Sequence, residues 1–154
     1  MVEERFDDLI MRTDLYVENG KICCPKVESK ISLEDLEQKK AEQGAFAFYS
    51  AASPDTLICS IEYVIKRSKP ELCYSTEKQY LKQGYMKKAM EHTLCWITQN
   101  KVKGCLWLLI EPENTASVKI AQRFNFIKQN DKLNGKDWYC LNLDDVRQKE
   151  LSHV

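Results

Sequence analysis

Two short segments of this sequence carry residues suited to binding an anion and to moving a proton. The first runs from a predicted strand, Glu71-Leu72-Cys73-Tyr74, into a helix that begins near Lys82-Gln83-Gly84-Tyr85-Met86. Backbone N–H groups at a helix N-terminus attract an anion, and glycine lets the backbone come close to it. Residues 82–86 are therefore predicted to bind a pyrophosphate, with Lys82 adding positive charge. The alternative is that Gly84 only serves the turn into the helix.

The second segment is Pro112-Glu113-Asn114-Thr115-Ala116-Ser117. Asn114 is typical of a helix N-cap, because its side chain accepts a hydrogen bond from the first turn. Ser117 lies one turn further on, where a serine is most often solvated or bonded to its own helix. The two histidines, His92 in mid-helix and His153 near the end, are not placed to form a triad with a cysteine and an acid.

The elements that position these residues follow from apolar periodicity and turn residues. Strands are predicted at 15–17, 21–23, 45–49, 57–65, 71–76, 105–110, 126–129 and 138–143, and helices at 32–43, 83–100 and 114–123. Asn19-Gly20 and Asn134-Gly135 favour tight hairpin turns, and Gly44 is expected to end the first helix. The apolar run 105–110 predicts a central strand covered on both faces. The order predicts a mixed α/β fold in a single domain over residues 1–154.

Composition narrows the class of protein. The 154 residues fit one domain, and 44% hydrophobic with 30% charged residues is typical of a soluble globular chain. The formal net charge of zero disfavours nucleic-acid binding. The longest apolar run is too short for a membrane helix, and the acidic N-terminus is unlike a signal peptide. Seven cysteines without a C-x-x-C pair indicate reduced thiols, no metal site and a cytoplasmic location.

At this point residues 57–143 resemble the GNAT acyl-CoA-dependent N-acetyltransferases, and within them the RimJ/RimL branch that modifies ribosomal-protein N-termini. The family's strand, phosphate loop and helix are similar to one stretch of this sequence. It consists of the strand 71–74, the next nine residues and then Gly84-Tyr85-Met86. The segment 112–117, followed by Ala121-Gln122-Arg123-Phe124-Asn125-Phe126, is similar to its second block. Asp137, before the last strand, is a weaker third point of similarity.

The resemblance implies an acetyl-CoA site and names its residues. The implied contacts with the co-substrate are Tyr74, Ser75, Thr76, Lys82, Gln83, Gly84, Tyr85, Met86 and Asn114. Ser117 is then a candidate to donate a proton to the leaving thiolate. Lys87 and Lys88 are either solvated or meet the 3′-phosphate of the adenosine. The thioester carbonyl is expected where the strands 71–76 and 105–111 diverge.

The sequence also departs from the family pattern. Leu81 replaces the polar first position of the phosphate motif, and Met86 replaces its small last position. Leu109 and Ala121 stand where several members carry a glutamate base and a tyrosine acid. The phosphate loop is therefore degenerate, and the usual assignment of base and acid is lost.

Acetyl transfer to an alkyl amine still needs a base, since the amine has a pKa near ~10 and must lose a proton. Glu71 and Glu111 are the candidate bases; Glu71 is preferred because it matches the glutamate of the family's first block. Each could instead be a charge at a strand end, and Tyr139 is an alternative acid. No credible nucleophile is present, which favours direct transfer in a ternary complex.

The resulting hypothesis is an N-acetyltransferase whose acceptor is a protein N-terminus, a small amine or an amino acid. Residues 57–143 would form the acetyl-CoA-binding core and residues 1–50 an atypical acceptor-side region, in a monomer or a homodimer. Two alternatives stay open: a catalytically silent module of the same fold that binds an acyl-CoA or a protein partner, and an unrelated α/β binding domain.

Overall fold

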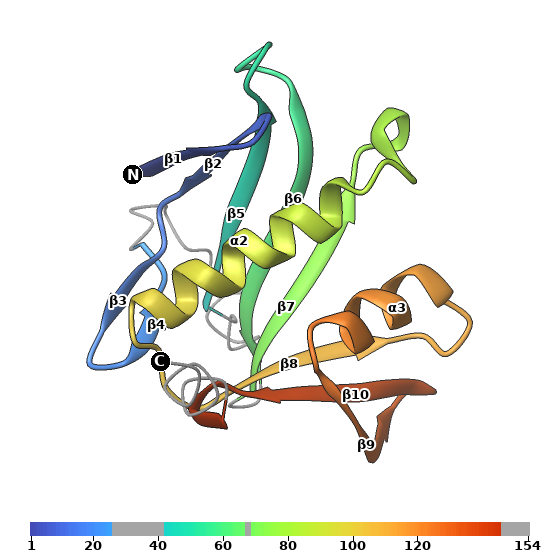
Figure 1. Cartoon of the computed structure of the whole chain (residues 1–154). Coiled ribbons are helices and arrows are strands. Elements are labelled where there is room, and N and C mark those ends of the chain that lie inside the picture. Colours follow the sequence, from blue (N-terminus) through green and yellow to red (C-terminus); the bar gives the residue numbers. More distant parts are fainter. Residues whose placement is uncertain (26–41, 67–68, 146–154) are drawn as a thin grey trace, which may run out of the picture.

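The structure, a computed structural model, describes residues 1–25, 42–66 and 69–145. One mixed sheet of eight strands has the order β1-β2-β5-β6-β7-β8-β10-β9, and β3 and β4 form a separate hairpin (Figure 1). The strands are β1 (Val2–Phe6), β2 (Leu9–Thr13), β3 (Tyr16–Glu18), β4 (Lys21–Cys23), β5 (Glu42–Ser50), β6 (Leu57–Lys66), β7 (Lys69–Thr76), β8 (Cys105–Ile110), β9 (Ile127–Leu133) and β10 (Lys136–Asn142).

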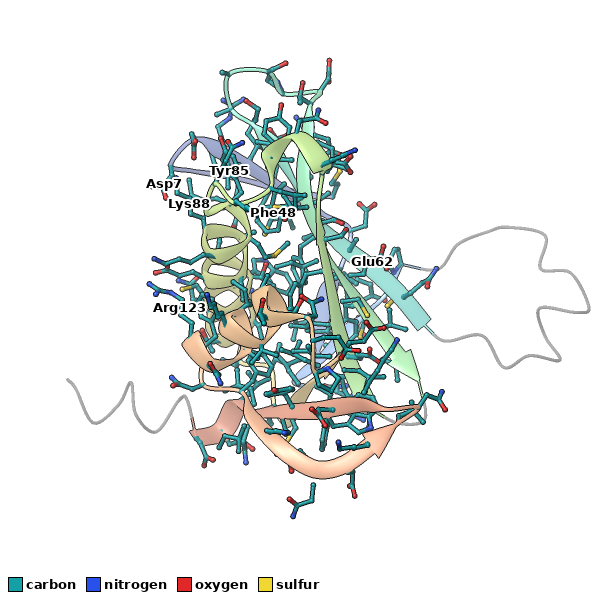
Figure 2. All side chains as sticks on the ribbon, turned by 90° about the vertical axis from the view of Figure 1, so that its right-hand side faces the viewer. Asp7, Phe48, Glu62, Tyr85, Lys88 and Arg123 are labelled. Atoms are coloured by element: carbon teal, nitrogen blue, oxygen red, sulfur yellow. The ribbon has the colours of Figure 1, made fainter. Side chains whose placement is uncertain are left out.

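Two helices cover one face of this sheet. The helix α2 (Tyr85–Gln99) packs on β6 and β7, and α3 (Thr115–Arg123) packs on β8. The buried face of α2 carries Ala89, Met90 and Ile97, which the helical periodicity predicted. In Figure 2 both helices lie on one side of the sheet, whereas Glu62 of β6 points away on the other. We call these the helix face and the open face.

The strands β7 and β8 are parallel, as expected for strands joined through a helix, but they pair only briefly. Between their described residues a single Cα pair is formed, Glu71 with Trp107, whereas β6 and β7 pair along their whole length. Figure 1 shows β7 and β8 diverging beyond this point. Beyond this point the described backbone groups of β7 and β8 do not pair with each other. The sequence resemblance predicts the thioester carbonyl at this divergence.

The N-terminal part differs from the sequence prediction. The hairpin of β1 and β2 at residues 2–13 was not predicted, although it extends the sheet at its edge. Most of the helix predicted at 32–43 lies outside the described residues, and its last two residues belong to β5. Gly44 does not end a helix: it lies within β5 and packs against Leu15, where a side chain would clash.

The remaining elements follow the prediction more closely. The Asn19-Gly20 and Asn134-Gly135 turns join β3 to β4 and β9 to β10, and all four residues have positive φ. The strand β8 lies inside the sheet but is not covered equally on its two faces. Leu106, Leu108 and Ile110 are buried on the helix face, while alternate residues are half-buried on the open face. Within the described residues, no helix has the length and apolar character to cross a membrane.

Candidate functional site

A cavity of about 430 Å³ lies between β7, the start of α2 and α3, and we call it the helix-side cavity. Its lining includes all nine residues that the sequence assigned to the co-substrate, namely Tyr74, Ser75, Thr76, Lys82, Gln83, Gly84, Tyr85, Met86 and Asn114. These residues come from three separate elements. The fold therefore brings together what the sequence placed in two distant blocks.

The N-terminus of α2 opens into this cavity with the features of an anion site. Gly84 is its N-cap at φ 81°, provides no side-chain cap, and leaves open space where a Cβ would stand. No acidic residue lies in the first turn of α2, so the helix dipole is not offset there. Lys82 also has positive φ, at 62°, which costs a non-glycine residue roughly 1–2 kcal/mol. The turn therefore holds strained backbone next to free N–H groups.

Two lysines of this region have different surroundings. Lys87 lines the helix-side cavity, whereas Lys88 pairs with Asp8 of the β1–β2 turn at 3.2 Å. Lys119 of α3 also lines the cavity, and the sequence analysis missed it. Helical spacing could have indicated Lys119, because residues three apart lie on the same side of a helix. Lys119 follows Ala116 by three residues, and Ala116 lines the cavity as well.

The start of α3 is fixed by Asn114. Its side-chain oxygen accepts a hydrogen bond from the backbone N–H of Ser117 at 3.2 Å, which confirms the predicted N-cap. Ser117 follows in the first turn, and its carbonyl oxygen accepts a hydrogen bond from the Tyr74 hydroxyl at 3.1 Å. The pair of contacts holds α3 against β7.

A second cavity of about 320 Å³ lies between the diverging strands, and we call it the inter-strand cavity. Its lining includes Cys73, Leu109 and Glu111, together with Lys136 of β10. Three further residues, Tyr74, Asn114 and Ser117, line both cavities. A ligand lying in the helix-side cavity can thus extend past these three residues to the opening between the strands.

Burial raises the pKa of Tyr74 to about 12, and a hydrogen bond to Ser117 partly offsets this effect. The hydroxyl therefore stays protonated at all physiological pH values. It can donate a hydrogen bond at the junction of the two cavities but is a poor base.

The two candidate bases lie in different places. Glu111 lines the inter-strand cavity. Glu71 lines neither cavity; it faces the open side of the sheet, and its Oε1 accepts a hydrogen bond from the Sγ of Cys73 at 3.5 Å. Since Cys73 lines the inter-strand cavity, Glu71 lies next to a residue of its lining.

Three other residues that the sequence analysis discussed, His92, Tyr139 and Asp137, occupy structural positions. His92 stacks on Phe6 and contacts Glu4 at 2.7 Å, away from either cavity. Tyr139 is buried in the core. Asp137 is buried and pairs with Lys128 and Lys132 of β9 at 3.6 and 3.5 Å.

A third cavity, of about 630 Å³, is larger than the other two but lies at the opposite end of β8, near Cys105. None of the residues predicted for binding or catalysis lines it. Cavity volume alone would therefore point to a different end of the sheet from the one that carries the predicted residues.

The comparison with known proteins identifies the family. A profile for the acetyltransferase (GNAT) domain matches residues 7–127, so the chain belongs to the GNAT acetyltransferases and its sheet with flanking helices is the GNAT fold. No curated protein matches the sequence.

Solved structures share this fold at low sequence identity. The ribosomal-protein-S5-alanine acetyltransferase of Vibrio fischeri is 16% identical, with a TM-score of 0.61 over 94% of this chain and 98% of that chain. The spermidine/spermine N-acetyltransferase SpeG of Vibrio cholerae is 13% identical, with a TM-score of 0.61 over 92% and 96% of the two chains. A Bordetella pertussis protein assigned to the GNAT acetyltransferases is 17% identical, with a TM-score of 0.55; the match spans 64% of this chain and 63% of that one.

Proposed function

We propose that this protein transfers the acetyl group of acetyl-CoA directly to a primary amine. The observation that carries the proposal is the continuity of the site: the helix-side cavity meets the inter-strand cavity at Tyr74, Asn114 and Ser117. The first cavity suits a pyrophosphate and a pantetheine arm. The second suits a thioester, because diverging strands offer unpaired backbone groups.

The chain's own residues then have separate tasks. The first-turn N–H groups of α2 and the ammonium groups of Lys82 and Lys87 bind the phosphates. A backbone N–H group at the divergence stabilises the negative charge that develops on the carbonyl oxygen. The Ser117 hydroxyl is placed toward the leaving sulfur from the helix face, where it can donate a proton, while the Tyr74 hydroxyl holds the Ser117 carbonyl.

The acceptor amine approaches from the open face in this proposal. The Glu71 carboxylate lies on that face beside Cys73, and Glu111 lines the inter-strand cavity. Either carboxylate can take the proton of the ammonium, with Glu71 acting through a water molecule. A place in the RimJ/RimL branch would make the acceptor a protein N-terminus. A small amine or an amino acid is equally compatible with this geometry.

The deciding experiment measures binding before turnover. A ligand that binds only the folded state adds RT ln(1 + [L]/Kd), about 2.7 kcal/mol at 100 times Kd, and raises the melting temperature by roughly 5–11 °C for a chain of this size. We expect acetyl-CoA to produce this shift, and an amine panel to produce free CoA. No thermal shift and no calorimetric heat at millimolar acetyl-CoA would overturn the proposal. Binding without turnover would instead favour the catalytically silent module, to which the departures at Leu81, Met86, Leu109 and Ala121 point.

A further inference from the structure

Two lysines stand on the open face beside the inter-strand cavity. Lys69 is two residues before Glu71 on β7, so both side chains lie on the same face. Lys136 lines the inter-strand cavity from β10. Among the residues the structure describes, neither lysine has a carboxylate within ion-pair distance.

The ammonium of Lys69 is held in place by two indoles. Its Nζ lies 4.6 Å from the ring centroid of Trp107 and 4.4 Å from that of Trp138. The two rings meet edge to face, at 85° and 6.0 Å, and so form a corner around the charge. Cation–π contacts fix the position of an ammonium without neutralising it, and its N–H donors stay available.

Lys69 does not line the inter-strand cavity, and Trp107 lines the third cavity, but the strand register connects both indoles to residues of the proposed site. Trp107 pairs with Glu71, and Trp138 pairs with Leu109, which lines the inter-strand cavity. Lys69 therefore extends along the open face from the foot of β7 toward the divergence of the strands. Lys136 reaches the same cavity from the other side of Trp138, two residues away on β10.

The open face thus carries two kinds of charge. Glu71 and Glu62 lie on it from β7 and β6, and Glu111 lines the cavity. These carboxylates suit the ammonium form of an acceptor amine. The fixed ammonium of Lys69 and the unpaired Lys136 suit an anion a short distance away, and would repel a second cation on the acceptor.

We propose that the acceptor is an amine that also carries a carboxylate, and that Lys69 and Lys136 bind this carboxylate while the amine faces the inter-strand cavity. The inference rests on the proposed acetyl transfer and adds the charge of its acceptor. The carboxylate can belong to a free amino acid or to an acidic side chain near a peptide N-terminus, and the test separates these two sources.

The peptide arm compares Ala-Glu-Ala amide with Ala-Gln-Ala amide and Ala-Lys-Ala amide, whose N-terminal amines have closely similar pKa values. The small-molecule arm compares alanine with alaninamide at equal concentrations of the unprotonated amine. We expect kcat/KM to favour the carboxylate in at least one arm by about tenfold, the size of one charge-assisted hydrogen bond. The arm that shows the preference identifies the source.

Variants connect the preference to the two lysines. Lys69→Met keeps an unbranched chain between the indoles, and Lys136→Met removes the other charge; each should reduce the preference by about fivefold or more. Lys69→Arg should retain it. Lys101→Met, in the exposed turn after α2 and outside the lining of the three cavities, should leave it unchanged. Three outcomes would overturn the inference. The first is an equal kcat/KM for the Glu and Gln peptides and also for alanine and alaninamide. The others are a preference for the Lys peptide and a carboxylate preference that neither Met variant changes.

A binding readout keeps this result separate from that of the proposed function. Trp107 and Trp138 border the site, so quenching of tryptophan fluorescence in the presence of CoA reports the affinity for each peptide and for alanine and alaninamide. Carboxylate-dependent affinity that is lost in Lys69→Met would support the inference even if no acetyl group is transferred. Carboxylate-independent affinity in both arms would contradict it even if transfer occurs.

Discussion

The hydroxyl of Tyr74 donates a hydrogen bond to the carbonyl oxygen of Ser117 over 3.1 Å and thereby joins β7 to the first turn of α3. These two residues are 43 positions apart in the sequence, and both line the two cavities. This contact therefore lies where the helix-side cavity and the inter-strand cavity meet. A change in it should affect stability and catalysis together.

Tyr74→Phe removes this hydrogen bond and keeps the ring. The net contribution of such a bond is about 0.5–1.5 kcal/mol, so the melting temperature should fall by a few degrees. Tyr49→Phe is the matched control, because Arg12 contacts the Tyr49 ring and not its hydroxyl. Equal melting temperatures for wild type and Tyr74→Phe would show that the bond adds nothing to stability.

The pH dependence of stability gives a second test of Tyr74. Burial raises its pKa to about 12 in the folded state, above the ordinary value near ~10, so the folded state holds its proton more tightly. This stabilisation is complete below pH ~10 and is lost as the pH rises from ~10 to ~12. Urea unfolding over this range should therefore show a steeper loss of stability in wild type than in Tyr74→Phe, which has no hydroxyl to ionise. Parallel curves would contradict the raised pKa.

Glu71→Gln tests the preferred base. The substitution keeps the size of the side chain and removes the proton acceptor, so kcat should fall by about 10²- to 10⁴-fold while the Kd for CoA stays nearly constant. Glu111→Gln is the matched variant, since Glu111 lines the inter-strand cavity directly. A normal kcat in a folded Glu71→Gln protein, together with a large loss in Glu111→Gln, would transfer the role to Glu111.

How far the sequence predicted the fold depends on the kind of signal. Asn-Gly turns, the amphipathic α2 and the Asn114 cap are local signals, and the structure confirms each. The β1–β2 hairpin has no such signal. Its turn, Asp7-Asp8, contains no glycine, and Asp7 adopts a φ of 49° itself. Edge strands of this kind depend on packing against the rest of the sheet, which the local pattern does not reveal.

Most residues that line the helix-side cavity were predictable, because a short motif specifies a turn and a helix start. Two lysines that line the cavities from other elements were not predictable from the sequence. Lys119 lines the helix-side cavity from α3, and Lys136 lines the inter-strand cavity from β10. Their places follow from tertiary packing and strand register. The same is true of Gly44, whose role is to leave room for Leu15 in the core rather than to end a helix.

Asn114 is the N-cap of α3, and we propose that it also contacts the pantetheine arm. Asn114→Ala should cost about 1 kcal/mol through loss of the cap. Asn114→Asp keeps a capping oxygen and complements the helix dipole, so its melting temperature should match wild type. If the amide also contacts the co-substrate, Asn114→Asp should weaken CoA binding without loss of stability. Wild-type CoA affinity in the Asp variant would leave Asn114 as a cap alone.

The most direct test of the phosphate site is at Gly84. Gly84 has a φ of 81°, so a side chain introduced there must adopt the left-handed backbone conformation. A side chain has room there, since no atom lies within 4 Å of an added Cβ, so the cost comes from the left-handed backbone and should be roughly 1–2 kcal/mol. Asn tolerates this conformation better than most residues, and Asp is nearly the same shape.

Gly84→Asn and Gly84→Asp therefore form a matched pair that differs in charge. Both should melt below wild type by similar amounts. Gly84→Asn should weaken CoA binding by crowding the backbone N–H groups of α2, whereas Gly84→Asp should abolish it, because a carboxylate repels the pyrophosphate from the same position. The measurement is CoA affinity by calorimetry on variants shown to be folded. Equal CoA affinity in the two variants, at the wild-type value, would mean that the phosphates bind away from the N-terminus of α2.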